Sequence, residues 1–284
     1  MNFSKILAFV AVTLLVAAAC ASPSAPKATV TKTTSTAVST TNIPTVVPTQ
    51  KPALTVAPAM KPTVVSATRA PITSTTYAPI IEPANFVTHI DNAYLPLVPG
   101  TTMVYEGKTE KGNEHNEVYV SHDTKVIMGV TCVVVTDTVM VDSKLEELTV
   151  DWYAQDKQGN VWYFGEDSKD VLNGKVTSTA GSWTGGVNGA LPGIVMQANP
   201  QPGDPYRQEY YKGEAEDLAQ VLSVTETITI PTGSYSEVLT TNEWSELDNP
   251  RVYEHKYYAK GVGFLMTKYV EGGYELKLIA IRHD

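Results

Sequence analysis

The sequence has few of the residues that build small metal or disulfide sites. Its 284 residues include only two cysteines, Cys20 and Cys132, and five histidines, none of which shows His-x-x-x-His or His-Glu-x-x-His spacing. Zinc sites need several Cys or His ligands at close spacing, so the sequence predicts none. Cys132 lies in the apolar run Val130–Val135, which predicts a buried and unreactive thiol.

The chain also lacks an apolar run long enough to cross a membrane. The N-terminal run Ile6–Ala19 has 14 residues, whereas a spanning helix needs roughly 20. Lys5 precedes this run, and three alanines and Cys20 end it. A positive start, a short apolar middle and small residues at the end are typical of an export signal. We therefore predict that residues 1–19 are a signal peptide.

The end of this segment, Leu15-Val16-Ala17-Ala18-Ala19-Cys20, resembles the signal of bacterial lipoproteins. The resemblance implies lipidation of Cys20, which becomes the mature N-terminus, although Ala17 stands where that family usually has leucine. Two or more acyl chains, at about 0.8 kcal/mol per buried methylene, would hold the protein on a membrane, facing outside the cytoplasm. The alternative is ordinary secretory cleavage after Ala19, which would release a soluble protein.

Residues 20–84 are predicted to form a disordered linker. Thr, Ser, Pro and Ala fill 40 of the 60 positions from 21 to 80, and no acidic residue occurs there. Such a segment has too little apolar bulk to offset the entropy of ordering. The globular domain is then expected over residues 85–284. That domain has 29 acidic and 15 basic side chains, which argues against binding to nucleic acid.

The domain has the composition of strands throughout, so an all-β fold is predicted, with one short helix as an alternative to a strand at 214–222. Short Gly, Asn, Asp or Pro turns separate the strands, which favours sequential antiparallel hairpins in a strongly curved sheet, either half-barrel or barrel-like. The Gly-rich stretch 181–203 is expected to be a long loop, of the kind that often forms a binding edge. Strands are expected at 102–108, 114–122, 130–141, 145–154, 160–166, 205–211, 221–230, 236–244, 251–259, 263–270 and 274–281.

Three segments resemble exported bacterial proteins. They are Ile230–Tyr235, Tyr257–Leu265 and the aromatic run from Asp151 to Glu166. They are similar to segments of lipoprotein-carrier-like half-barrels and of related uncharacterised secreted lipoproteins. The resemblance implies a curved antiparallel sheet, and it assigns no activity.

Carboxylates form the first candidate site. Alternation along 145–154 places Glu147 and Asp151 on one face, while Glu209 and His255 lie on later strands. If the sheet curls so that these strands face each other, Glu147, Asp151, Glu209 and His255 could bind calcium or another divalent cation. The alternative is a solvated acidic face that keeps the sheet soluble.

Aromatic residues suggest a second kind of site. Tryptophan and tyrosine on a concave sheet could stack on sugar rings or enclose an acyl chain, although such residues more often form the core. The leading hypothesis is a non-enzymatic, lipid-anchored binding domain for an apolar or amphiphilic ligand, a glycan or another envelope component. A cation-binding domain is the second hypothesis. The third hypothesis is an extracellular hydrolase that uses Asp151 and Glu209. The sequence predicts no definite cofactor beyond the possible divalent cation.

Overall fold

The structure, a computed structural model, describes residues 77–203 and 205–284. The predicted signal peptide, Cys20 and nearly all of the predicted linker lie outside these residues. Within them, no helix is both long enough and apolar enough to span a membrane. The fold is all-β, as the sequence predicts, and its helical part is the 3-10 turn η1 (Pro83–Asn85).

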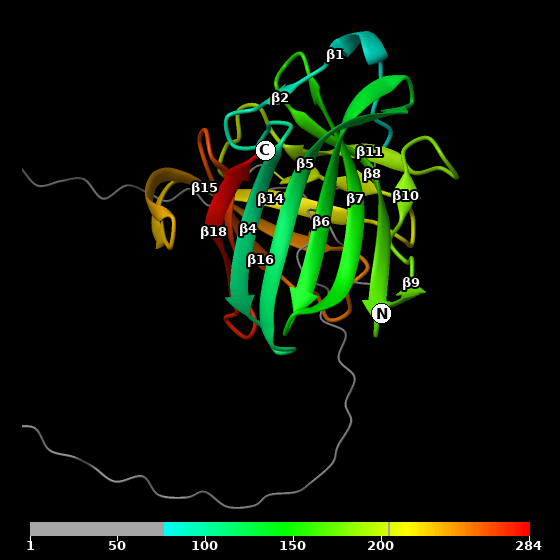
Figure 1. The fold of residues 1–284 in the computed structure, drawn as a ribbon. Coiled ribbons are helices and arrows are strands. Elements are labelled where there is room, and N and C mark those ends of the chain that lie inside the picture. The colour runs from blue at the N-terminus through cyan, green and yellow to red at the C-terminus, as the bar shows by residue number, and fades with distance from the viewer. Residues whose placement is uncertain (1–76, 204) are drawn as a thin grey trace, which may run out of the picture. The chain divides into compact units, whose positions relative to one another are not determined.

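Antiparallel strands form a strongly curved sheet (Figure 1). Its hydrogen-bonded order is β12-β14-β15-β16-β17-β18-β4-β5-β6-β7-β8-β11-β13. The strands on this path are β4 (Thr101–Lys108), β5 (Asn113–Ile127), β6 (Val130–Val141), β7 (Lys144–Asp156), β8 (Val161–Leu172), β11 (Leu191–Met196), β12 (Pro205–Arg207), β13 (Glu209–Tyr210), β14 (Asp217–Ile230), β15 (Gly233–Ser245), β16 (Glu254–Ala259), β17 (Gly263–Tyr269) and β18 (Glu275–His283).

The two ends of this path meet, so the sheet is nearly closed as a barrel with one seam. At the seam, the backbone N–H of Gln208 donates to the carbonyl of Asp217 at 2.9 Å. Tyr211 and Ala215 form an isolated antiparallel bridge nearby. Short strands flank the main path: β1 (Phe86–Val87) pairs with β7, while β9 (Lys175–Ser178) and β10 (Trp183–Thr184) pair with β8.

One half of the barrel interior is filled by apolar side chains. Strand alternation points every second residue inward, and the inward set at this end is aliphatic or aromatic. The stacked rings of Tyr153 and Tyr163 have centroids 4.8 Å apart. The largest fully buried side chains of this cluster are Tyr105, Tyr153, Tyr163, Tyr258, Phe264, Leu95, Leu97, Met196, Leu239, Leu265 and Leu276, while the equally buried Phe164 packs in a second cluster with Cys132 and Trp152.

A small hairpin of β2 (Ile90–Asp91) and β3 (Pro96–Leu97) packs against the β7–β8 turn. The Gln155 side-chain oxygen accepts hydrogen bonds from the backbone N–H groups of Asp91 and Asn92, at 3.0 and 2.8 Å. The Asn92 amide in turn donates to the carbonyls of Gly159 and Gln197. Part of the aromatic run at 151–166 therefore serves to hold this hairpin on the barrel.

The predicted turn at Gly159 is confirmed, because Gly159 has a φ of 95° and the strands on either side are paired. Asp156 fixes this turn by accepting backbone hydrogen bonds from Gln158 and Asn160, at 3.0 and 2.9 Å. Cys132 is buried as expected, and burial raises the pKa of its thiol to about 12.

Of the two alternatives for 214–222, the strand is the one found: β14 begins at Asp217, and Leu218 and Ala219 pair with β15 and are buried. One part of the chain differs from the prediction, because the expected long loop at 181–203 contains β10 and β11, which pair with β8. In addition, the linker prediction extends to residue 84, but Tyr77 already contacts the sheet, where its hydroxyl donates to the carbonyl of Pro192 at 2.8 Å.

At Gly107 of β4, the backbone of the paired strand β18 lies too close to admit a side chain, and this close approach gives a first test of the barrel. A Cβ atom at this position would lie 2.2 Å from the carbonyl oxygen of Glu275. We expect Gly107→Ala to lower the free energy of unfolding by about 1–3 kcal/mol, because the strands must separate to admit the methyl group. Denaturant unfolding monitored by tryptophan fluorescence measures this. Glu106→Ala, at the exposed neighbouring position, should change stability by less than about 0.5 kcal/mol; equal effects would contradict the close crossing.

Candidate functional site

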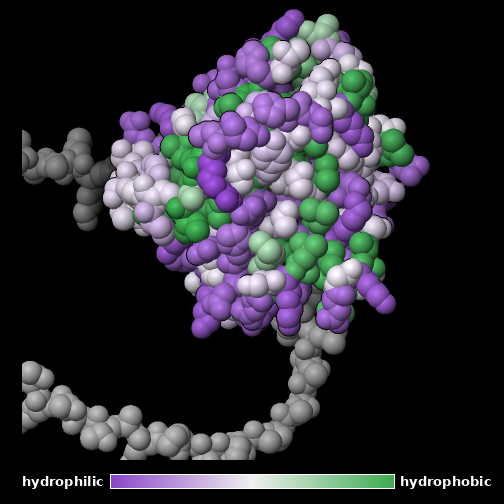
Figure 2. All heavy atoms as spheres, viewed as in Figure 1, coloured by the Kyte–Doolittle hydropathy of each residue, from purple (hydrophilic) through white to green (hydrophobic). Residues whose placement is uncertain are grey.

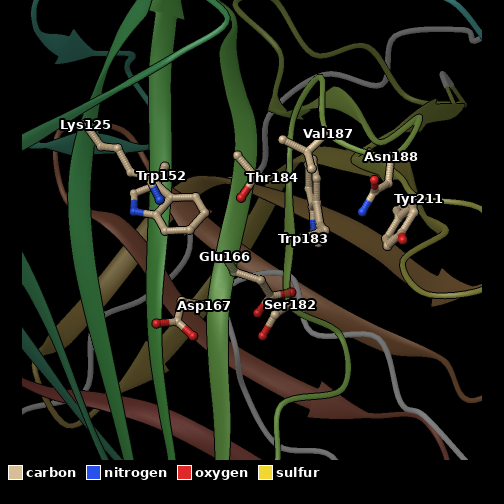
Figure 3. A pocket seen from close by; sticks show the side chains of 10 residues that line it. All are labelled: Lys125, Trp152, Glu166, Asp167, Ser182, Trp183, Thr184, Val187, Asn188 and Tyr211. Atoms are coloured by element: carbon tan, nitrogen blue, oxygen red, sulfur yellow. The ribbon is translucent and has the colours of Figure 1, made fainter.

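A pocket of about 400 Å³ lies beside strand β8. Figure 3 shows Lys125 and Trp152 on one side of it and Trp183, Asn188 and Tyr211 on the other. The segment from Ser182 to Asn188, which the sequence analysis expected to be a loop, supplies half of the lining. The complete lining is Lys125, Trp152, Glu166, Asp167, Ser182, Trp183, Thr184, Val187, Asn188 and Tyr211.

The two tryptophans are fixed by charged neighbours. The ammonium of Lys125 lies 3.2 Å from the centre of the Trp152 ring, a cation–π contact. The indole N–H of Trp183 donates to Oε2 of Glu209 at 2.9 Å, and both side chains are buried. These contacts set the ring orientations before any ligand arrives, which reduces the entropy lost on binding.

Some polar side chains at the rim of the pocket already form hydrogen bonds within the protein. Ser182 Oγ donates to the carbonyl of Ser168 at 3.1 Å, and the carboxylate of Asp167 accepts from Lys169 at 2.6 Å. Within the described residues, no hydrogen bond is formed by the side chains of Asn188 and Tyr211. Their amide and hydroxyl groups are therefore available to a ligand that carries several hydroxyls or amides.

The second half of the barrel interior is polar. On β5, β6 and β7 the inward positions include Glu114, Asp137, Glu147 and Asp151, each at most 5% exposed. Glu147 accepts a hydrogen bond from the Thr149 hydroxyl at 2.9 Å, and Asp151 accepts one from the Tyr163 hydroxyl at 2.5 Å. These carboxyl groups are out of water, so their ionised forms are strongly disfavoured.

The pKa values of these groups reflect that burial. Burial raises the pKa of Glu114 to about 7, and the nearby Asn116 amide offsets part of the rise without reaching hydrogen-bond geometry. Burial raises the pKa of Asp151 to about 7 against the opposing hydrogen bond from Tyr163. Burial, together with the charges of Asp151, Glu147 and Glu114, raises the pKa of Asp137 well above its ordinary value.

The inner face of β15 and β16 is also acidic, but it has a lysine. Lys256 on β16 is buried, and its ammonium lies 3.0 Å from Oε2 of Glu243 and 3.8 Å from Oε2 of Glu254. Glu243 also accepts from the hydroxyls of Thr241 and Tyr258, at 2.7 and 3.3 Å. Burial raises the pKa of Glu254 to about 8 despite Lys256.

The structure separates the four residues proposed from the sequence as cation ligands. Glu147 and Asp151 share the inner face of β7, as alternation predicted. Glu209 lies at β13 with Trp183, and His255 lies between the inward-facing Glu254 and Lys256, so it projects from the outer face of β16. Across residues 77–203 and 205–284, no group of three or more His, Cys, Asp or Glu side chains is arranged to hold a metal ion.

Several residues that the structure brings together were not predicted from the sequence. Glu114, Asn116 and Asp137 join Glu147 and Asp151 on the inner wall. Strand alternation at 114, 116 and 118 could have revealed the first two, had the register with β6 been known. The lining of the pocket could not be assembled from spacing, because its residues come from distant parts of the chain.

Comparisons with known proteins give weak likenesses. No family model and no curated protein matches the sequence. A Bacteroides fragilis protein of solved structure, described as exported and as having a YmcC-like fold, is 13% identical; the match covers 67% of this chain and 99% of that one, with a TM-score of 0.40. A Parabacteroides distasonis protein described as a lipoprotein is 14% identical, with 68% and 100% covered and a TM-score of 0.38. At these identities and TM-scores, neither likeness bears on function.

Because these carboxyl groups are buried, we predict that the free energy of unfolding falls as pH rises. The folded state raises the pKa of Glu114, Asp151 and Glu254 from ordinary values near 4 to about 7–8, so it binds protons more tightly than the unfolded chain. This contribution is complete below about pH 4 and is lost as pH rises to about 8. Chemical denaturation at pH 5 and pH 8 should show lower stability at pH 8. Glu114→Gln should flatten this dependence and the exposed Glu106→Gln should not; a wild-type profile in Glu114→Gln would contradict the assignment.

Proposed function

We propose that the protein is a non-enzymatic, extracytoplasmic binding domain, held on a membrane by a lipid at Cys20, that binds a hydroxylated envelope ligand such as a glycan. The pocket beside β8 is the proposed binding site. The observation that carries the proposal is the pair of Asn188 and Tyr211 groups without internal hydrogen bonds in one pocket of about 400 Å³, which Trp152 and Trp183, 5% and 4% exposed, border on either side.

The chemistry of the pocket favours a polar ligand with an apolar face. Sugar rings have such a face, which packs on aromatic side chains, while their hydroxyls need donors and acceptors around the edge. The volume lies within the range of about 300–1,000 Å³ that is usual for small-molecule sites. A mono- or disaccharide unit of a larger polymer is therefore the ligand class that we infer.

An acyl chain is a poorer candidate for the barrel interior. The apolar half is occupied by fully buried side chains such as Tyr105, Tyr258 and Phe264, which pack on one another with ring centroids 5.2 and 5.4 Å apart. A lipid tail would have to displace these rings and open cavities among them, which costs several kcal/mol in a packed core.

The carboxyl groups argue for binding rather than hydrolysis. A glycoside hydrolase needs two carboxyls that flank a ligand, one as acid and one as base or nucleophile. Here Glu209 is buried and accepts from Trp183, and Asp151 is buried and accepts from Tyr163. Each is committed to an aromatic donor within the core, so we propose that neither carries out catalysis.

The glycan proposal predicts that the pocket rim controls affinity. The full chain in detergent would be applied to an array of immobilised hexose and N-acetylhexosamine oligosaccharides, and hits would be measured by calorimetry. We expect Asn188→Ala and Tyr211→Ala each to weaken binding about tenfold or more, as removal of one ligand-contacting group commonly does.

Lys175→Ala, on β9 outside the pocket lining, is the matched control and should bind as the wild type does. Melting temperatures establish that the rim variants stay folded. An array without any hit, or unchanged affinity in both rim variants, would remove the glycan proposal. Binding of fatty acids instead, with retention in Asn188→Ala, would favour a lipid ligand outside this pocket.

The anchor is tested separately at Cys20. Because acylation occurs on the cysteine sulfur, Cys20→Ser should move the protein from the membrane fraction to the soluble extracytoplasmic fraction. Fractionation after expression in a bacterial host, with mass spectrometry of the N-terminal peptide, measures this. Cys132→Ser retains the proposed lipidation site and should stay membrane-bound. A wild-type protein that is already soluble and carries no acyl mass would show secretory cleavage instead.

A further inference from the structure

Three neighbouring side chains in the polar half of the barrel lack hydrogen-bond partners. Glu114, Asn116 and Asp137 are 2%, 0% and 1% exposed. Among the residues that the structure describes, none of the six terminal oxygen and nitrogen atoms of these side chains reaches hydrogen-bond geometry, although the Asn116 amide lies near Glu114 and the backbone N–H of Thr138 lies near Asp137. A buried polar group without a partner costs about 1–3 kcal/mol, and more when it is charged. Three such groups together indicate a place for a ligand.

The sheet register places these groups on one oblique line. Asn116 lies opposite Val139, and Val118 lies opposite Asp137, so Asn116 and Asp137 are diagonal neighbours across β5 and β6. Asp137 lies opposite Thr149, two residues before Asp151 on β7, which makes Asp137 and Asp151 diagonal neighbours as well. Diagonal neighbours in antiparallel sheets are about 7–8 Å apart. Glu114, Asn116, Asp137 and Asp151 thus follow each other across three strands.

The distance between these neighbouring groups indicates how large their ligand must be. A calcium ion needs several oxygens at about 2.3–2.6 Å, which groups spaced about 7–8 Å apart do not provide. Valines fill the positions between the carboxyls: Val118 is beside Asp137, Val135 is opposite Asp151, and Val139 is opposite Asn116. A complementary ligand has positive groups separated by short apolar stretches.

We propose that this line binds a linear aliphatic polyamine, whose ammonium groups donate to the carboxylates of Glu114, Asp137 and Asp151 and to the amide oxygen of Asn116. The methylene segments then pack on the valines. Glu114 is the second residue of β5, directly after the hairpin at 109–112, so the line starts near the rim of the barrel and leads inward. Lys256 on β16 does not replace the ligand, because its ammonium is bound by Glu243.

The test is calorimetric titration of the full chain in detergent with spermidine at pH 8. We expect one-site binding and a higher melting temperature, because a ligand of the folded state stabilises it. Binding should release protons, since the carboxyls are partly protonated before the cation arrives; titrations in buffers of different ionisation enthalpy measure this release. Affinity should fall at pH 6, where the carboxyls retain their protons.

Asp137→Asn preserves shape, removes the central charge and should weaken spermidine binding at least tenfold. Glu114→Gln is the second variant, in case Asp137→Asn folds poorly, and the exposed Glu106→Gln is the matched control. The proposal is overturned if magnesium chloride of equal ionic strength stabilises the protein as much as spermidine does. It is equally overturned if both interior variants bind as tightly as Glu106→Gln does. Glycan binding in the pocket beside β8 is measured independently, so the two proposals fail separately.

Discussion

The burial of carboxyl groups inside a nearly closed sheet is the constraint on which the rest of the structure depends. Closure removes the inner face of every strand from water, and alternation then decides which residues face inward. At one end those residues are apolar and pack densely. At the other end Glu114, Asp137, Glu147 and Asp151 face inward on one wall, and on the opposite wall the buried Lys256 forms an ion pair with Glu243. Such a chamber needs protons or cations to be stable.

Local pattern was sufficient to predict most of the fold. Strand β6 runs from Val130 to Val141, as predicted, because β-branched residues alternate along it and turns bound it. The parts that differed depend on tertiary pairing: β10 is a two-residue strand that exists because Trp183 pairs with Glu166. No local signal distinguishes such a strand from a loop, since its stability comes from contacts with a distant segment of sequence.

The candidate sites were less predictable for the same reason. Alternation on β7 alone shows that Glu147 and Asp151 share a face, but it does not show that this face is the inner one, since the opposite face carries the more apolar Leu148 and Val150. The neighbouring Asn116 and Asp137 could be added only once the β5–β6 and β6–β7 registers were known. A shift of either register by one residue would turn these side chains to the opposite face of the sheet. His255 shows the converse error: it was grouped with these carboxylates by residue type, although alternation beside Lys256 turns it to the outer face.

The two proposed sites are physically connected through one pair of residues. Asp151, at the inner end of the oblique line, lies opposite Glu166 in the β7–β8 register, and Glu166 also lines the pocket beside β8. Neighbouring carboxyls in a medium of low polarity strongly affect each other's protonation. The outer face around β4–β7, by contrast, is mainly hydrophilic with separate apolar patches (Figure 2), so the buried carboxyls lie on the inner side of strands whose outer side faces water.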